Sequence, residues 1–179
     1  MSRYRRARTG TTYFFTLVSY ARRPILCQEP IRKLLRLAVQ NVRARRPFEI
    51  DAWVLMPDHL HCVWTLPEGD RDYSTRWAQI KRTVSRFCGE DMLVGHPVSE
   101  SRRKHRDSVI WQRRFYEHQI VDEDDFGRHV DYVHFNPVRH GHAENAASWP
   151  FSTFHRYVRA GLLPADWGGS AQAQSMHLE

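Results

Sequence analysis

The sequence has few cysteines and no long apolar run, and both absences narrow the class of protein. Cys27, Cys62 and Cys88 are odd in number and far apart, and none of them forms a Cys-x-x-Cys pair. A disulfide framework or a thiolate zinc site is therefore not expected, and a reducing cytosol fits. No stretch is apolar enough to span a bilayer, and the N-terminus has no apolar signal core. We therefore expect a cytoplasmic protein with no membrane partner.

Acidic residues are nearly absent from the first quarter of the chain. Residues 1–46 hold twelve lysines and arginines but a single acid, Glu29, whereas residues 47–179 hold fifteen basic and nineteen acidic residues. A basic end on a mildly acidic body predicts a polyanionic partner, most simply nucleic acid. The alternative is a charged surface that only keeps the protein soluble. The densest cluster lies in a predicted flexible arm over residues 1–10 and consists of Arg3, Tyr4, Arg5, Arg6 and Arg8.

The length and the 41% hydrophobic content predict one folded domain over residues 1–168, followed by a disordered tail over residues 169–179. Alternation and helical periodicity indicate four strands, three helices and a long polar loop. The strands are expected at 11–19, 48–56, 59–66 and 115–120, the helices at 30–45, 74–88 and 122–135, and the loop at 89–108. Residues 109–111 form a further strand-like segment.

The order of these elements is β-α-β-β-α-β plus one more helix, which predicts an α+β fold of the ferredoxin-like split β-α-β type. We expect a central antiparallel sheet with helices on one face and the other face open to a substrate. In the second helix, Ser74 is the expected N-cap, and Pro137 is expected to stop the last helix. The second helix should turn Trp77, Ile80, Val84 and Phe87 inward and Arg76, Lys81, Arg82 and Arg86 outward.

The chemical signal is strongest at His59 and His61. Successive side chains of a strand point to opposite faces, so the two imidazoles project from one face and Leu60 from the other. Two imidazoles on one side of a strand can hold a divalent metal. They could equally be ordinary polar residues of a half-buried sheet, which is the better interpretation of an isolated pair.

The last predicted helix supplies a second group of polar residues. Tyr132 and Asn136 are four residues apart and share a helix face, with His129 beside them. A metal held by His59, His61 and the amide oxygen of Asn136 could polarise a scissile phosphate for in-line attack by Tyr132. Such attack would leave a 5′-phosphotyrosine and a free 3′-hydroxyl. Alternatively, Tyr132 packs the helix on the sheet and Asn136 is a helix C-terminal residue chosen to precede Pro137.

Together these motifs resemble a known enzyme group. His59-Leu60-His61 is the His-hydrophobic-His signature of the HUH single-strand endonucleases. Residues 53–67, 110–118, 131–141 and 149–155 resemble the REP-associated tyrosine transposases, and the similarity runs from about Tyr4 to Trp167. The resemblance implies that His59 and His61 are metal ligands and that Tyr132, rather than the competing Tyr116, is the nucleophile. Related insertion-sequence enzymes usually have glutamine where this chain has Asn136, whose side chain is shorter.

The resemblance also implies a substrate, which is single-stranded DNA carrying a palindromic hairpin with a short tetranucleotide at its foot. The basic arm is the expected reader of those bases. Phosphate contacts are expected from Lys81, Arg82, Arg86, Arg113 and Arg114, although a solvated-surface role fits each of these equally well.

We therefore predict a metal-dependent single-strand DNA endonuclease and strand transferase that uses Mg²⁺ or Mn²⁺ and Tyr132. A non-catalytic protein that binds hairpin DNA is the main alternative, and a metal-dependent hydrolase that uses water is a third. A monomer is favoured, because the hairpin-associated family is thought to act as monomers, and a dimer is possible because insertion-sequence relatives work as dimers.

Overall fold

The computed structural model describes residues 10–88 and 110–169, together with Ala173 and Ser175. The predicted basic arm, the 89–108 loop and most of the predicted tail lie outside the described residues. The helices and strands are β1 (Thr12–Val18), η1 (Tyr20–Arg22), α1 (Glu29–Arg45), β2 (Glu49–Leu55), β3 (His59–Thr65), α2 (Tyr73–Phe87), β4 (Tyr116–Gln119), α4 (Glu123–Arg139), η3 (Ala146–Ser148) and α5 (Phe154–Arg159).

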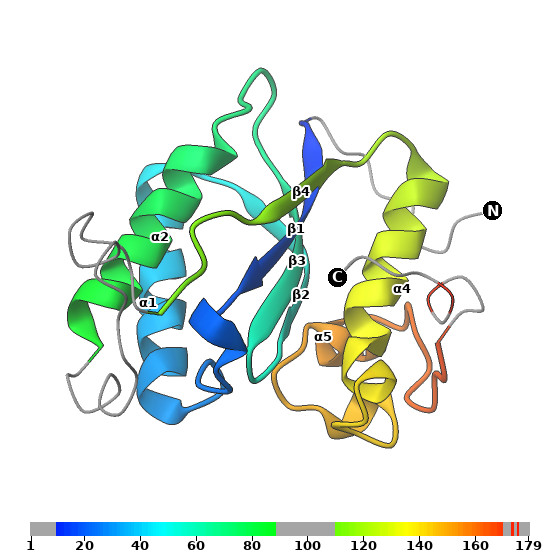
Figure 1. The fold of residues 1–179 in the computed structure, drawn as a ribbon. Helices are drawn as coiled ribbons and strands as arrows, with labels where there is room; N and C mark the ends of the chain where they lie inside the picture. The colour runs from blue at the N-terminus through cyan, green and yellow to red at the C-terminus, as the bar shows by residue number, and fades with distance from the viewer. Residues whose placement is uncertain (1–9, 89–109, 170–172, 174, 176–179) are drawn as a thin grey trace.

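The strands form one antiparallel sheet in the order β2-β3-β1-β4. This order and the connections β1-α1-β2 and β3-α2-β4 confirm the ferredoxin-like split β-α-β prediction (Figure 1). The register places Thr16 of β1 opposite His61 of β3 and also opposite Tyr116 of β4. Residues that lie directly opposite one another point to the same face, so all three belong to one face of the sheet.

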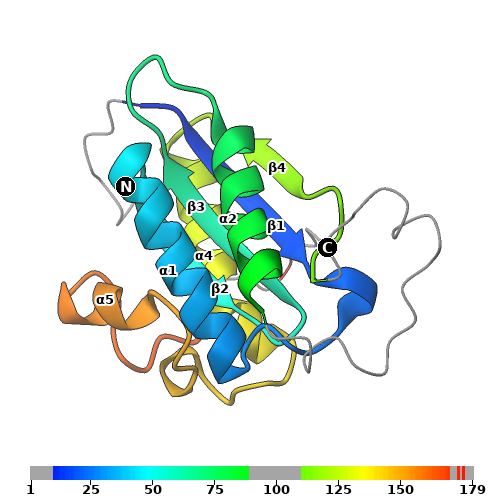
Figure 2. The same ribbon diagram turned by 90° about the vertical axis from the view of Figure 1, so that its left-hand side faces the viewer.

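Helices α1 and α2 cover the other face of the sheet, where their apolar stripes pack on β1 and β3 (Figure 2). The centre of this layer is aromatic: Trp64 of β3 stacks on Trp77 of α2 with ring centroids 4.0 Å apart. Leu60 and Cys62 of β3, and Leu66 directly after it, are buried in the same cluster. Their burial fits the alternation predicted for β3.

The face that carries the histidines is not open, and the sequence prediction was wrong on this point. Helix α4 and the segment around α5 pack on it, so that helices cover both faces of the sheet (Figure 1). The strands also carry apolar side chains on the histidine face, namely Phe14, Val54 and Val63. These side chains alternate with those that pack under α1 and α2, so they need a second helix layer to bury them. Val130 and Val133 of α4 supply part of it.

Helix α2 differs from the prediction at both ends. Its N-cap is Asp72, whose carboxylate accepts a hydrogen bond from the Thr75 backbone N–H, rather than Ser74. Arg76 is not on the outer face: it is 1% exposed and donates two hydrogen bonds to the Asp70 carboxylate. Phe87 was expected inside but is 61% exposed, since it is the last residue of the helix and extends past the core.

Helix α4 begins as predicted, with the Asp122 carboxylate accepting from the Asp125 N–H and three acidic residues in its first turn. It continues through Pro137 to Arg139, one turn further than predicted. A proline lacks the N–H that would bond to the carbonyl four residues earlier, and its ring crowds that carbonyl; here the helix ends within two residues of it. Of the strand-like segment expected at 109–111, Trp111 forms only an isolated bridge with Ser19.

Cys27, Cys62 and Cys88 are free thiols. Among the described residues, no helix combines the length and the apolar character that a membrane crossing requires.

Candidate active site

Strand β3 carries His59 and His61 on the face that α4 covers. Their rings lie edge to face with centroids 4.8 Å apart, and they are 2% and 0% exposed. The one-face geometry predicted from the His-x-His spacing is therefore present, although beneath a helix rather than on an open surface.

Each histidine is held through its Nδ1 atom. His59 Nδ1 donates to Asp58 Oδ1 over 2.6 Å, and His61 Nδ1 lies 2.8 Å from the hydroxyl of Thr16 on the neighbouring strand β1. The Asp58 carboxylate fixes the tautomer of His59, and both partners hold the orientation of the ring and direct Nε2 to its opposite edge. The two Nε2 atoms are thus the metal-binding candidates.

Asp58 also accepts a hydrogen bond from Arg22 over 3.1 Å. Partial burial acts to raise the pKa of Asp58, but the hydrogen bonds and charges of His59 and Arg22 outweigh it and hold this pKa below its usual value. Asp58 is therefore an anion at neutral pH, and it supports the donor role of His59 Nδ1–H.

Helix α4 brings the two remaining candidates to the histidines. Asn136 Oδ1 lies 3.2 Å from His59 Nε2, and the Tyr132 ring centroid lies 5.1 Å from that of His61. Tyr132 is 1% exposed and Asn136 is 0% exposed. The four residues named from the sequence as nucleophile and metal ligands thus come together between β3 and α4.

The contact between His59 and Asn136 tests whether a cation suits this position. Because Nδ1–H of His59 is committed to the Asp58 carboxylate, the Nε2 lone pair is the one that can receive a proton or a metal ion. That lone pair faces the amide oxygen of Asn136, which is also an acceptor. Two converging acceptors are stabilised by a proton or by a metal ion between them, so the donor set fits a divalent cation that accepts nitrogen and oxygen ligands.

Tyr132 has a cationic and an aromatic neighbour. The Arg139 guanidinium carbon lies 5.8 Å from the centre of the tyrosine ring, and Phe14 meets the ring edge-on at 5.9 Å. Arg139 follows Tyr132 by two helical turns, and its position beside the ring was missed because the helix was expected to stop at Pro137. Thr16 was missed because only the pairing of β1 with β3 connects it to His61. Asp58 is adjacent to His59 in the sequence, and this adjacency could have identified it.

Tyr116, the competing tyrosine, lies on β4 on the same face of the sheet and is 47% exposed. Its ring contacts Phe14 at 6.3 Å between centroids. It is therefore more accessible than Tyr132, whereas Tyr132 is packed against His61.

The predicted DNA-contacting residues fall into three groups. Arg82, Arg86, Arg113 and Arg114 are exposed. Lys81 instead donates to the backbone carbonyls of Gln112 and Arg113, over 2.7 and 3.0 Å, and so ties α2 to the segment before β4. Arg3, Tyr4, Arg5, Arg6 and Arg8 lie outside the described residues.

A basic groove, which the sequence reasoning missed, runs along α1 beside the outer edge of β2. It encloses about 620 Å³, and its lining contains no acidic residue. Half-buried Trp53 and Phe151 contribute aromatic surface, and the Arg32 guanidinium carbon lies 4.4 Å from the centre of the Phe151 ring. The groove's arginines are Arg32, Arg36, Arg43 and Arg159.

Known proteins resemble this chain both in sequence and in structure. The family model described as Transposase IS200 like matches residues 7–136. A REP-associated tyrosine transposase of Escherichia coli K12 is 45% identical over 170 residues, which cover 94% of this chain and 92% of the relative. A Haemophilus influenzae protein provisionally assigned to the same family is 41% identical over 95% of both chains. The solved structure of a REP-associated tyrosine transposase bound to a REP hairpin matches with a TM-score of 0.73 and 43% identity, covering 95% of this chain and 93% of the other.

The ferredoxin-like sheet and the match over residues 7–136 place the protein in the class of IS200-like transposases. Within that class, the chain belongs to the REP-associated tyrosine transposases. The family resemblance identified from the sequence motifs is thereby confirmed.

Proposed function

We propose that this protein is a metal-dependent single-strand DNA endonuclease and strand transferase that recognises palindromic DNA hairpins and cleaves through Tyr132. The observation that carries the proposal is the meeting of Tyr132 and Asn136 of α4 with His59 and His61 of β3. The solved relative that matches nearly the whole chain is bound to a REP hairpin, which supports hairpin DNA as the partner.

In the proposed reaction, the Tyr132 phenolic oxygen attacks the scissile phosphorus and the phenol loses its proton. The bond from phosphorus to the 3′-oxygen breaks, and the 3′-oxygen leaves as a hydroxyl after taking up a proton. The product is a 5′-phosphotyrosine, which keeps the energy of the phosphodiester for later rejoining. Mg²⁺ or Mn²⁺ held by His59, His61 and Asn136 would polarise the phosphate.

The residues around the centre have supporting roles in this proposal. Asp58 and Thr16 orient the two imidazoles through Nδ1. Arg139 lies beside the Tyr132 ring, and its positive charge favours the phenolate that forms during attack. The burial of Tyr132 and Asn136 requires that side chains around them shift before a phosphate can enter.

DNA contacts are proposed at three surfaces. The predicted basic arm would read the bases at the hairpin foot, and exposed Arg82, Arg86, Arg113 and Arg114 would bind phosphates. The basic groove would bind a single-stranded segment, because aromatic side chains can stack on bases while arginines pair with the backbone. We further propose a cytoplasmic monomer, in keeping with the prediction from the sequence.

The test is incubation of the protein with a hairpin oligonucleotide that carries single-stranded flanks, in Mg²⁺ or Mn²⁺. A covalent protein–DNA adduct that survives denaturing electrophoresis is expected for the wild type and for Tyr116→Phe, and none for Tyr132→Phe. Equal adduct formation by Tyr132→Phe would refute the assignment of the nucleophile. His59→Ala should lose cleavage and keep hairpin binding.

One observation favours the alternative of a hairpin-binding protein that does not cut, namely the near-complete burial of Tyr132. That alternative predicts salt-sensitive hairpin binding with no adduct in any divalent cation. Cleavage that persists in Tyr132→Phe without an adduct would instead indicate a hydrolase that uses water.

A further inference from the structure

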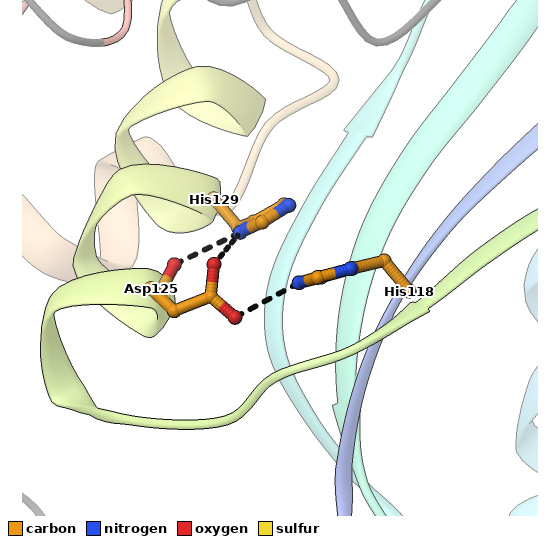
Figure 3. A group of neighbouring side chains, drawn as sticks. All are labelled: His118, Asp125 and His129. Carbon is orange, nitrogen blue, oxygen red and sulfur yellow. Dashed lines mark hydrogen bonds and ion pairs between the residues drawn. The ribbon is translucent and has the colours of Figure 1, made fainter.

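A second group of potential metal ligands lies at the junction of β4 with the first turns of α4, away from the paired histidines. It consists of His118 on β4 and of Asp125 and His129 on α4 (Figure 3). One potential ligand atom from each residue lies within 4.8 Å of the other two. None of these side chains takes part in the proposed cleavage reaction.

The carboxylate of Asp125 is the centre of the group. It accepts from His118 Nε2 over 2.8 Å, and its other oxygen lies 3.1 Å from His129 Nδ1. The two imidazole rings stack with centroids 4.7 Å apart and planes 16° from parallel. Both rings thus contact one anionic group from the same side, as Figure 3 shows.

His129 has an unused nitrogen. Its Nδ1 lies 2.9 Å from the backbone carbonyl of Asp125, which can only accept, so Nδ1 carries the proton. Its Nε2, at the edge of the ring away from Asp125, is buried and has no hydrogen-bond partner in the described part of the chain. The proton can therefore move from Nδ1 to Nε2, which would leave the Nδ1 lone pair facing the Asp125 carboxylate. Burial also lowers the pKa of His129, which favours the neutral form that binds metals.

The dimensions suit a small transition-metal ion. Bonds of about 2.0–2.1 Å in tetrahedral geometry place zinc ligands roughly 3.3 Å apart. The donors, at most 4.8 Å apart, would need to approach by no more than about 1.5 Å. Two imidazoles and a carboxylate form a set that zinc uses in proteins, with water in the fourth position.

We propose that His118, Asp125 and His129 form a second metal site, for Zn²⁺ or a similar ion, which fastens β4 to α4. Strand β4 has four residues and, within the described ranges, pairs with β1 alone, so it is an edge strand with few hydrogen bonds of its own. The site would anchor the N-terminal half of the helix that carries Tyr132 and Asn136. To bind the metal, His118 Nε2 and His129 Nδ1 would lose the protons that they share with Asp125, and these protons would move to the other ring nitrogen or to solvent.

This site shares no ligand with the His59 and His61 centre, so it can be tested separately. The experiment uses the full-length protein, freed of metal and then dialysed against Zn²⁺, with bound zinc counted by elemental analysis. His118→Gln should bind one fewer tight equivalent than wild type, with affinity for that equivalent lowered by roughly 100-fold or more. The same difference should appear between His59→Gln/His61→Gln and the triple variant that adds His118→Gln. His142→Gln, which replaces an exposed histidine, is the matched control and should bind as wild type does.

A second measurement is the thermal unfolding midpoint. Zn²⁺ should raise it in wild type and in His59→Gln/His61→Gln, and this increase should be lost in His118→Gln. Unchanged stoichiometry and an unchanged zinc response in His118→Gln would overturn the proposal and leave a hydrogen-bonded cluster only. Should His118→Gln fail to fold, the His59→Gln/His61→Gln variant decides: one tight equivalent supports the site, and none overturns it.

Discussion

Replacing Asp58 with asparagine should weaken the metal centre without affecting DNA recognition. Asp58 Oδ1 receives the Nδ1–H of His59 over 2.6 Å, and the acceptor is charged because the pKa of Asp58 is held below its usual value. A hydrogen bond to a charged acceptor is about twice as strong as one between neutral groups. Asp58→Asn keeps the size of the side chain and removes the charge.

The expected magnitude follows from the position of the two residues. Loss of a partner that orients a metal-bound histidine typically lowers metal affinity by about 10–100-fold, or roughly 1.4–2.8 kcal/mol. His59 is buried but the Asp58 side chain is 22% exposed, so water partly screens the charge. We therefore expect the lower end, a weakening of about 10-fold.

The assay measures covalent adduct formation at increasing Mn²⁺ concentration, beside hairpin binding in EDTA. Asp58→Asn should require about 10-fold more Mn²⁺ for half-maximal adduct, approach the wild-type maximum at saturation, and bind the hairpin normally. Asp166→Asn, at an exposed position, should match wild type in both measurements. An identical Mn²⁺ dependence in Asp58→Asn would refute the reasoning, because the carboxylate would then contribute nothing to the centre.

Three further predictions concern charge elsewhere in the molecule. Burial lowers the pKa of His134 from 6.5 to about 3. The unfolded chain therefore binds a proton that the folded chain does not between those pH values, and stability should fall as the pH drops below about 6.5. Between pH 7 and pH 5, the free energy of unfolding measured in urea should fall by roughly 2 kcal/mol less in His134→Gln than in wild type. An equal fall in both proteins would contradict this prediction. Arg76→Met should destabilise the protein by about 3 kcal/mol, because it leaves the Asp70 carboxylate and three backbone carbonyls, those of Arg46, Pro47 and Asp72, without their donor. The control Arg71→Met, at an exposed position, should change stability by less than about 0.5 kcal/mol. Arg36→Ala with Arg43→Ala should weaken hairpin binding and reduce the slope of its salt dependence by about 0.7–0.9 per arginine, and an unchanged slope would exclude the basic groove as a DNA surface.

Local sequence patterns predicted many of the helices and strands of the fold. The periodicity of α1 predicted a helix at 30–45, and the structure has it at Glu29–Arg45. The short Pro57-Asp58 connection predicted an antiparallel hairpin, and β2 pairs with β3 in that way. Such features depend on neighbours within a few residues, where backbone geometry leaves few choices.

Errors arose where distant segments decide the outcome. Arg76 has a side chain usually found on the surface, and its burial depends on carbonyls some thirty positions away, Arg46 and Pro47.

The His59-Leu60-His61 motif shows the same division most clearly. The sequence alone determined that the two imidazoles share a face, because the side chains of a strand alternate. Only the tertiary structure decided that α4 covers this face, that Thr16 of β1 holds His61, and that Asn136, 77 positions along the chain, lies 3.2 Å from His59. Strand pairing and helix docking depend on the complementarity of whole surfaces, which no spacing of residues along the chain encodes locally.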